Sequence, residues 1–304
     1  MTDSGLPPHL RTLEHHLEVR FPYFAKIVGK RLEDFGPAWR DDFESELARF
    51  FNADSVALTR ATDGYGAFAL DALKLQKVFD KERQYRPKRY EDVAAAVYHS
   101  QQYMFDLYLP GILLSQFLWP HHYRQLLFFR ERFVPMAKAI APTRFFDVGV
   151  GTGFYSKEML ERLAGTCGVG FDISEHSLAH TAKMLERWGM SARYECRRQD
   201  ILALDPAPQA DCITSVEVLE HLEDPPAFLR ALHRMLRPGG LGYLTAAVNA
   251  PNADHIYLYT KGEDVAREIR AAGFTIVDSD EYFGFVPRAG ESVPSGAVFV
   301  VRKD

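Results

Sequence analysis

Cysteine is scarce in this sequence, and an excess of positive charge is missing. The three cysteines among 304 residues are Cys167, Cys196 and Cys212, and no two of them stand at the C-x-x-C spacing. This argues against a disulfide framework, and we expect three buried, apolar thiols in a reducing compartment. With 36 Lys and Arg against 41 Asp and Glu, the formal net charge is -5. Nucleic acid is therefore not expected as a partner, because phosphate backbones bind basic surfaces.

Long hydrophobic runs are missing as well. The longest nearly uncharged apolar stretch, residues 107–120, is interrupted by prolines and is too short to span a bilayer. The first ten residues, MTDSGLPPHL, have neither the basic nor the apolar segment of a secretory leader. We therefore expect a cytoplasmic protein without a membrane partner.

The hydrophobic periodicity changes near residue 141. Residues 38–51, 64–85 and 88–109 carry apolar side chains at helical spacing. Because proline ends or kinks helices, we expect breaks at Pro87, Pro110, Pro120 and Pro135. We predict an all-α cap over residues 1–140 that is rich in aromatic side chains, and a second domain over residues 141–304.

The second domain alternates short apolar runs with helical ones. Strands are expected at 144–150, 167–173, 192–201, 211–216, 241–248, 274–282 and 297–302, and helices near 154–163, 175–188, 225–236 and 263–272. This alternation predicts a Rossmann-like, doubly wound, mostly parallel sheet of seven strands. The last two strands have no helix between them, so we expect an antiparallel hairpin at the edge of the sheet.

A glycine-rich turn follows the first expected strand. Gly149, Gly151 and Gly153 alternate with other residues, and Phe154 stands where the dinucleotide fingerprint has its third glycine. Asp147 comes two positions before the first glycine, where a carboxylate would repel a pyrophosphate and attract an ammonium group. The turn therefore favours a nucleoside with a cationic tail over NAD.

Two further acids follow the next two expected strands. Asp172 can accept hydrogen bonds from ribose hydroxyls, and Asp200 can accept one from an adenine amino group while Ile201 packs on the ring. For either acid alone, a turn or helix cap is the alternative interpretation. Three acids at the ends of three consecutive strands, with this turn, favour a nucleoside site.

Residues 143–301 resemble class I S-adenosylmethionine-dependent methyltransferases. The resemblance rests on DVGVGTG (147–153), GFDIS (170–174), RQDI (198–201), DCITSVEVLEHLEDP (211–225) and MLRPGGLGYLTA (235–246). VLEHL is similar to the small-molecule branch, such as the quinone-biosynthesis methyltransferases. The resemblance implies S-adenosylmethionine as cofactor. It places Asp147 and the glycines at the methionine moiety, Asp172 at the ribose, and Asp200 and Ile201 at the adenine. Ile173 is a further cofactor-binding candidate.

Candidate catalytic residues lie beyond the fourth and fifth strands and in the cap. Glu217 is expected to line the pocket near the methionine end, and His221 is the preferred general base, since an unperturbed imidazole titrates near pH 6.5. Capping or packing beside Asp224 is the alternative for His221. His255 is expected to face the same cleft, with the tyrosines at 257 and 259 on its side. Tyr103 in the cap is the third candidate, with core packing as its alternative.

We expect no metal site. His121 and His122 are adjacent, which would send their side chains to different sides, and no carboxylate or cysteine stands at a ligand spacing near them.

The expected activity is methyl transfer to a small, apolar or aromatic acceptor, with oxygen or carbon favoured over nitrogen. A sensor or partner subunit that binds the cofactor without catalysis, an aminopropyl transferase and a dehydrogenase are the alternatives. The oligomeric state is open, and a homodimer is included among the options.

Overall fold

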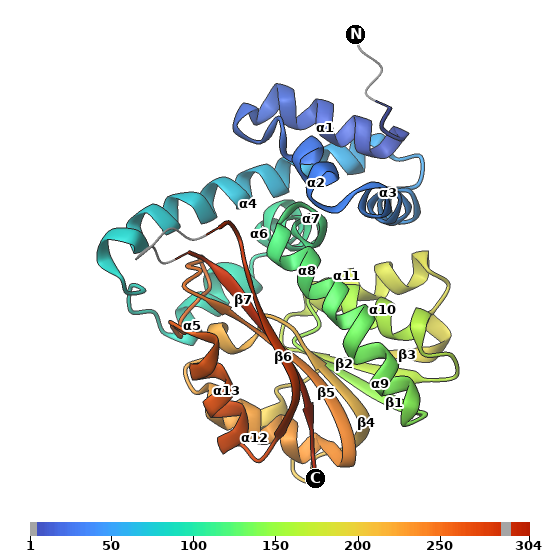
Figure 1. Cartoon of the computed structure of the whole chain (residues 1–304), viewed down its shortest axis with the longest axis vertical. Coiled ribbons are helices and arrows are strands. Elements are labelled where there is room, and N and C mark those ends of the chain that lie inside the picture. The colour runs from blue at the N-terminus through green and yellow to red at the C-terminus, as the bar shows by residue number, and fades with distance from the viewer. Residues whose placement is uncertain (1–4, 287–292) are drawn as a thin grey trace.

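The computed structural model describes residues 5–286 and 293–304, so the first four residues of the segment tested for a leader lie outside it. Seven strands in the described part form one sheet in the order β3-β2-β1-β4-β5-β7-β6 (Figure 1). The strands are β1 (Arg144–Val148), β2 (Cys167–Asp172), β3 (Tyr194–Arg198), β4 (Ala210–Ser215), β5 (Leu236–Val248), β6 (Thr275–Phe283) and β7 (Ser295–Arg302). The first five are parallel, and β7 runs antiparallel between β5 and β6. The predicted Rossmann-like sheet with an antiparallel edge pair is confirmed.

The helices of this half also follow the expected pattern. They are α10 (Phe154–Arg162), α11 (Glu175–Arg187), α12 (Pro225–Met235) and α13 (Gly262–Ala271). Strand β5 begins five residues before the expected position, because Leu236 pairs with Ala210 ahead of the kink at Gly239 and Gly240. β5 and β7 are buried over most of their length, as strands covered on both faces should be.

The helical half contains nine α-helices in its described part. They are α1 (Pro8–Arg20), α2 (Ile27–Phe35), α3 (Pro37–Phe51), α4 (Ser55–Glu82), α5 (Tyr90–Val93), α6 (Gln101–Tyr103), α7 (Leu109–Leu118), α8 (Pro120–Phe128) and α9 (Val134–Ala139). The long helix α4 begins nine residues before the expected 64, because the Asp54 side chain caps it by accepting a hydrogen bond from the Ala57 amide.

Two of the expected proline breaks are wrong. Pro110 and Pro135 lie in helices that continue from π-helical turns at Met104–Tyr108 and Phe129–Phe133. A proline lacks an N–H group and crowds the carbonyl four residues back, and the wider π turn accommodates both defects without breaking the helix. The expected break before Pro120 is confirmed, since Trp119 has an extended backbone.

The two halves share one hydrophobic core. The largest cluster of buried side chains includes residues from α1 and α3 as well as from β1, β5 and β7. Helix α8 lies against β6 and β7, and the Tyr243 hydroxyl on β5 donates to the Gln125 carbonyl on α8 at 2.9 Å. Figure 1 places the blue and cyan helices above one end of the sheet and the green α8 and α9 along its face. The helical half is therefore packed onto the sheet.

The cysteines differ from the expectation. Cys212 is buried in β4, but Cys196 is partly exposed and Cys167 is exposed. Cys167 is the first residue of β2, at the open end of the sheet, which explains its exposure. In the described ranges no helix is long and apolar enough to cross a membrane.

Candidate active site

A cavity of about 750 Å³ lies at the carboxyl ends of the parallel strands. Its lining includes residues that follow β1, β2, β3, β4 and β5, together with aromatic side chains from α4 and from the residues on either side of α7. Open α/β sheets bind ligands at this edge, because the loops after the parallel strands meet there. The helical half closes the cavity from the other side.

The three glycines of the turn after β1 have different surroundings. All have positive φ angles, at +75°, +55° and +78° in chain order. A Cβ on Gly149 would lie 2.5 Å from a Val218 methyl group, and one on Gly153 would lie 2.8 Å from a Thr181 methyl group. A Cβ on Gly151 would meet the Ile112 Cδ1 atom at 3.6 Å and the Gly149 backbone oxygen at 4.0 Å, which are ordinary van der Waals contacts. Two glycines are therefore required by packing inside the protein, whereas Gly151 exposes its backbone to the cavity.

Asp147 is almost fully buried at the end of β1. Its Oδ2 accepts from the Ser156 hydroxyl at 2.5 Å, and its Oδ1 accepts from the Thr214 hydroxyl at 2.8 Å. Burial raises the pKa of Asp147 to about 6, although both hydroxyls favour the charged form. Asp147 contributes to the cavity lining, but its oxygens are held by the sheet and α10. Its expected contact with an ammonium group stays a prediction.

Asp172 connects β2 to the glycine turn. Its Oδ2 accepts from the Gly151 amide at 3.1 Å, and its Oδ1 accepts from the Ser174 amide at 2.8 Å. Each carboxylate oxygen has a second lone pair that remains for a ligand hydroxyl. Asp172 and Ile173 both line the cavity. The carboxylate can therefore shape the turn and bind a ligand.

Asp200 and Ile201 lie at the same edge, after β3. Asp200 caps a short 3₁₀ turn, and its Oδ1 accepts from the Leu202 amide at 2.9 Å. Ile201 is 4% exposed and lines the cavity. The capping interpretation is thus correct for Asp200, and it leaves Oδ2 for a ligand.

Glu217 follows β4 in a strained backbone conformation with φ +53°. Thr245 holds it, since the Glu217 amide donates to the Thr245 hydroxyl at 2.9 Å and that hydroxyl donates to Oε1 at 2.8 Å. The Gln125 side chain also donates to Oε1, at 3.3 Å. Burial raises the pKa of Glu217. The strained turn places this acid in the cavity lining, as expected.

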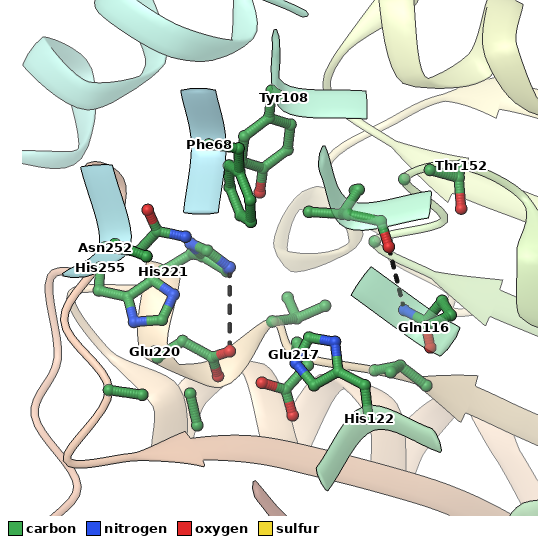
Figure 2. A pocket seen from close by; sticks show the side chains of 18 of the residues that line it. Phe68, Tyr108, Gln116, His122, Thr152, Glu217, Glu220, His221, Asn252 and His255 are labelled. Atoms are coloured by element: carbon green, nitrogen blue, oxygen red, sulfur yellow. Dashed lines mark hydrogen bonds and ion pairs between the residues drawn. The ribbon is translucent and has the colours of Figure 1, made fainter. Parts of the chain in front are cut away.

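His221 and His255 meet in the cavity, from the loops after β4 and β5 (Figure 2). Their ring centres are 4.8 Å apart and the rings are nearly perpendicular. The Nδ1 atom of His221 lies 3.2 Å from both the backbone oxygen and Oδ2 of Asp254. Burial, together with His221, lowers the pKa of His255 to about 3, so this ring is neutral at physiological pH. The two predicted histidines therefore form one cluster.

Two acids complete this cluster, and the sequence analysis gave neither a role. Glu220 and Asp254 are fully buried, and the Nε2 atom of His221 lies 3.9 Å from Oε1 of Glu220. Burial opposes the charge of Asp254, but His221 and His255 hold its pKa below the ordinary value. Each acid immediately precedes one of the histidines in the sequence. That repeated acid–histidine pair is the signal that could have identified them.

Three expectations about neighbouring residues change. Tyr103 lies outside the cavity lining of the described structure and stacks on Tyr108, which does line it. Tyr257 and Tyr259 do not share the side of His255, because both hydroxyls donate to Glu268 on α13, at 2.9 and 2.6 Å. The segment before Tyr259 is a loop, so strand alternation does not apply to it.

His121 and His122 both line the cavity, contrary to the expectation of opposite sides. They lie in the first turn of α8 with ring centres 4.5 Å apart. Adjacent helical residues are about 100° apart around the axis, so two neighbours can face the same space. Burial lowers the pKa of His122 to about 3.

The sheet, the turn and the strand-end acids define a nucleoside-binding transferase domain. A family described as a methyltransferase domain matches residues 146–241. Ubiquinone biosynthesis O-methyltransferase of Parvibaculum lavamentivorans is 32% identical over 171 residues, which cover 54% of this chain and 59% of the relative. The protein of the same name from Pseudomonas syringae pv. tomato is 34% identical over 38% of this chain and 48% of its own length.

A solved structure has a similar fold. An N-methyltransferase from Haemonchus contortus, solved with S-adenosylhomocysteine, superposes with a TM-score of 0.52 and 17% identity over 71% of this chain and 60% of its own. The family model and the curated relatives therefore support a class I S-adenosylmethionine-dependent methyltransferase domain in the C-terminal half. The chain spans about half to three-fifths of the length of the curated relatives it matches.

Proposed function

We propose that this protein transfers the methyl group of S-adenosylmethionine to a hydroxyl oxygen of a small, apolar or aromatic molecule. The main support for the proposal is that one cavity contains both the expected cofactor side and the expected acceptor side. Its lining joins the open glycine of the turn, the strand-end acids, the histidine cluster and an aromatic wall from the helical half. The curated relatives are O-methyltransferases of ubiquinone biosynthesis, which favours oxygen over carbon as the acceptor atom.

The cofactor side of the cavity fits a nucleoside with a cationic tail. Gly151 leaves room for a ligand against the backbone, and Asp172 and Asp200 have lone pairs for ribose and adenine donors. When bound, S-adenosylmethionine supplies an activated methyl group on a positively charged sulfur. Glu217 and Asp147 give this end of the cavity a negative character that suits such a charge.

The acceptor side is apolar. Tyr65, Phe68 and Trp119 line it, and the rings of the last two stack with centres 5.5 Å apart. Such a wall binds a flat or alkyl group and keeps water away from the reacting atoms. Catalysis then consists mainly of holding the acceptor oxygen against the methyl carbon.

His221 is the group suited to the acceptor proton. Asp254 faces its Nδ1 and stabilises the tautomer that carries a proton there, which leaves the Nε2 lone pair free. Because His221 lines the cavity, this lone pair can accept the proton of a hydroxyl as the oxygen attacks.

A pair of matched acceptor panels tests the proposal. The protein is incubated with methyl-labelled S-adenosylmethionine and either phenols or anilines that carry the same alkyl substituents, and labelled product is counted. We expect transfer to at least one phenol and none to its aniline. Transfer to anilines alone would contradict the choice of oxygen. Binding of the cofactor without transfer to any acceptor would instead support a sensor.

Two further expectations stay predictions from the sequence. Cell fractionation tests the cytoplasmic location, and light scattering tests whether the protein forms a homodimer.

A further inference from the structure

Glu220 is a buried carboxyl group whose two oxygens lack a well-formed hydrogen bond. Its side chain is 0% exposed, and no described residue donates a hydrogen bond of normal geometry to Oε1 or Oε2. An ionised carboxylate in such a place costs several kcal/mol unless it is paired, protonated or bound to a metal. The unpartnered oxygens of Glu220 are therefore available to a proton or to a cation.

Two imidazole nitrogens lie beside this carboxylate. One ligand atom from each of Glu220, His221 and His255 can be chosen so that all three lie within 4.8 Å of one another. His255 is 7% exposed, and its Nδ1 is buried without a hydrogen-bond partner among the described residues. Figure 2 shows the Glu220 carboxylate directed at the His221 ring, with His255 next to both. One ligand atom each from Glu220, His221 and His255 is therefore close enough to the others to contact a single ion.

The position of Asp254 strengthens this interpretation. Its carboxylate lies 3.2 Å from Nδ1 of His221, so Nδ1 carries the proton and the Nε2 lone pair points towards Glu220. A carboxylate behind a histidine is the usual arrangement around a metal-bound imidazole, because it fixes the ring and its tautomer. The Tyr98 hydroxyl in turn donates to Asp254 at 3.1 Å.

We propose that Glu220, His221 and His255 bind one divalent transition-metal ion, with an open coordination position facing the cavity. Two imidazoles and one carboxylate suit zinc and its neighbours in the first transition row better than magnesium or calcium, which prefer oxygen ligands. Bonds of about 2.0–2.2 Å place neighbouring ligand atoms roughly 3.4 Å apart in a tetrahedral site.

The ion gives the cluster a role in the methyl transfer, and this part rests on the proposed function. An acceptor hydroxyl bound at the open position loses its proton more readily, because the cation stabilises the oxygen anion. With the ion bound, the Nε2 lone pair of His221 is a metal ligand, and the proton that it would accept in the metal-free protein passes to solvent. The expectation of no metal site is revised by this proposal. Spacing in the sequence does not reveal this site, because His255 comes from a separate loop.

Titration of the metal-free protein with Co²⁺ tests the site. The full chain is treated with a chelator, and Co²⁺ is added while visible absorption is recorded and heat is measured by calorimetry. We expect one equivalent to bind, with the absorption of an ion held by nitrogen and oxygen ligands, and Zn²⁺ to displace it. Absence of binding would overturn the proposal.

Variants assign the ligands. Glu220→Gln and His255→Ala should each weaken Co²⁺ binding by about a hundredfold or more, and Asp254→Asn by roughly 10- to 100-fold. His121→Ala is the matched control, because His121 is another buried histidine of the same cavity with an unpartnered Nδ1, and it should leave the Co²⁺ affinity unchanged. Loss of binding in His121→Ala with retention in Glu220→Gln and His255→Ala would overturn the assignment.

Calorimetry with S-adenosylmethionine on the same metal-free samples separates this inference from the proposed function. Cofactor binding without Co²⁺ binding would reject the metal site alone. Co²⁺ binding without cofactor binding would support the metal site and reject the methyltransferase proposal. A variant that fails to fold is recognised by its thermal unfolding, and His255→Gln then replaces His255→Ala.

Discussion

The Nδ1 atom of His221 lies 3.2 Å from Oδ2 of Asp254, across the loops that follow β4 and β5. Asp254 is fully buried and the His221 side chain is 12% exposed, so solvent weakens this contact little. The pair fixes which ring nitrogen faces the cavity. Proton acceptance and metal binding by His221 both depend on that orientation.

Asp254→Asn should lower kcat at least tenfold and leave the dissociation constant of S-adenosylmethionine unchanged. The neutral amide cannot stabilise positive charge on His221, and it can stabilise the wrong tautomer. The measurement is kcat and KM for both substrates between pH 6 and 9. Asp264→Asn is the control, since Asp264 is the first-turn acid of α13 and contacts Arg267 and Thr260. Equal turnover in Asp254→Asn and the native protein would remove the pair from the mechanism.

Gly151→Ala and Gly149→Ala should have different effects. A methyl group at Gly151 meets no atom closer than Ile112 Cδ1 at 3.6 Å, so the fold should lose only about 1–2 kcal/mol from the positive φ. The affinity for S-adenosylmethionine should fall at least tenfold. At Gly149 the new Cβ would lie 2.5 Å from Val218, and the loss should appear mainly in folding stability. Urea unfolding and calorimetry measure the two effects. A Gly151→Ala protein with native cofactor affinity would show that the ligand does not approach this turn.

Asp172→Asn should weaken S-adenosylmethionine binding roughly 10- to 100-fold, because hydrogen bonds to a charged group contribute about 1.5–3 kcal/mol. Since Asp172 also accepts from the Gly151 and Ser174 amides, thermal unfolding without ligand must be compared as well. Glu175→Gln serves as control, because Glu175 is an exposed acid three residues further on. An unchanged dissociation constant by calorimetry would remove Asp172 from the cofactor site.

Lys157→Met should destabilise the protein by about 3–5 kcal/mol at pH 8, because it leaves a buried carboxylate uncompensated. Lys157 is 1% exposed and donates to Glu46 at 2.8 Å and to Glu158 at 2.7 Å, which links α10 to α3. The measurement is urea unfolding at pH 8 and pH 5. Lys74→Met removes an exposed ion pair with Asp71 and should cost less than about 1 kcal/mol.

The effect of Lys157→Met should depend on pH in one direction. Burial raises the pKa of Glu46 to about 6, above its ordinary value of 4.5, despite the attraction of Lys157. Because this pKa is raised, the charged form of Glu46 destabilises the folded protein above pH 6. This destabilisation disappears as Glu46 takes up a proton between pH 6 and 4.5. Without Lys157 the cost is larger, so the destabilisation should shrink at pH 5. A loss that is equal at both pH values would contradict a charged Glu46.

The sheet could be predicted from the sequence because each strand is a short apolar run between turn residues. The bounds of β1 and β2 agree with the expected ranges within a few residues, whereas the start of β5 was missed because Arg237 to Gly240 look like a turn. The helical half was harder. Its helices continue through Pro110 and Pro135 by π turns, which have no sequence signature comparable to a cap.

Part of the candidate site could likewise be predicted from the sequence, and part of it could not. Asp172 and Asp200 follow strands of a parallel sheet, so the topology alone brings them to one edge. Glu220, Asp254 and His255 meet only because two loops converge beneath the helical half, and no local spacing records that convergence. Tyr103 was chosen from its helix neighbours, and the structure places Tyr98 and Tyr108 in the cavity lining instead.

Thermal unfolding with S-adenosylmethionine, S-adenosylhomocysteine or NAD tests the central claim most directly. A ligand that binds only the folded protein stabilises it by about 2.7 kcal/mol at 100 times its dissociation constant, and the midpoint rises accordingly. We expect a rise with the first two compounds and none with NAD. A rise with NAD alone would contradict the assignment of the glycine turn and the reaction built on it.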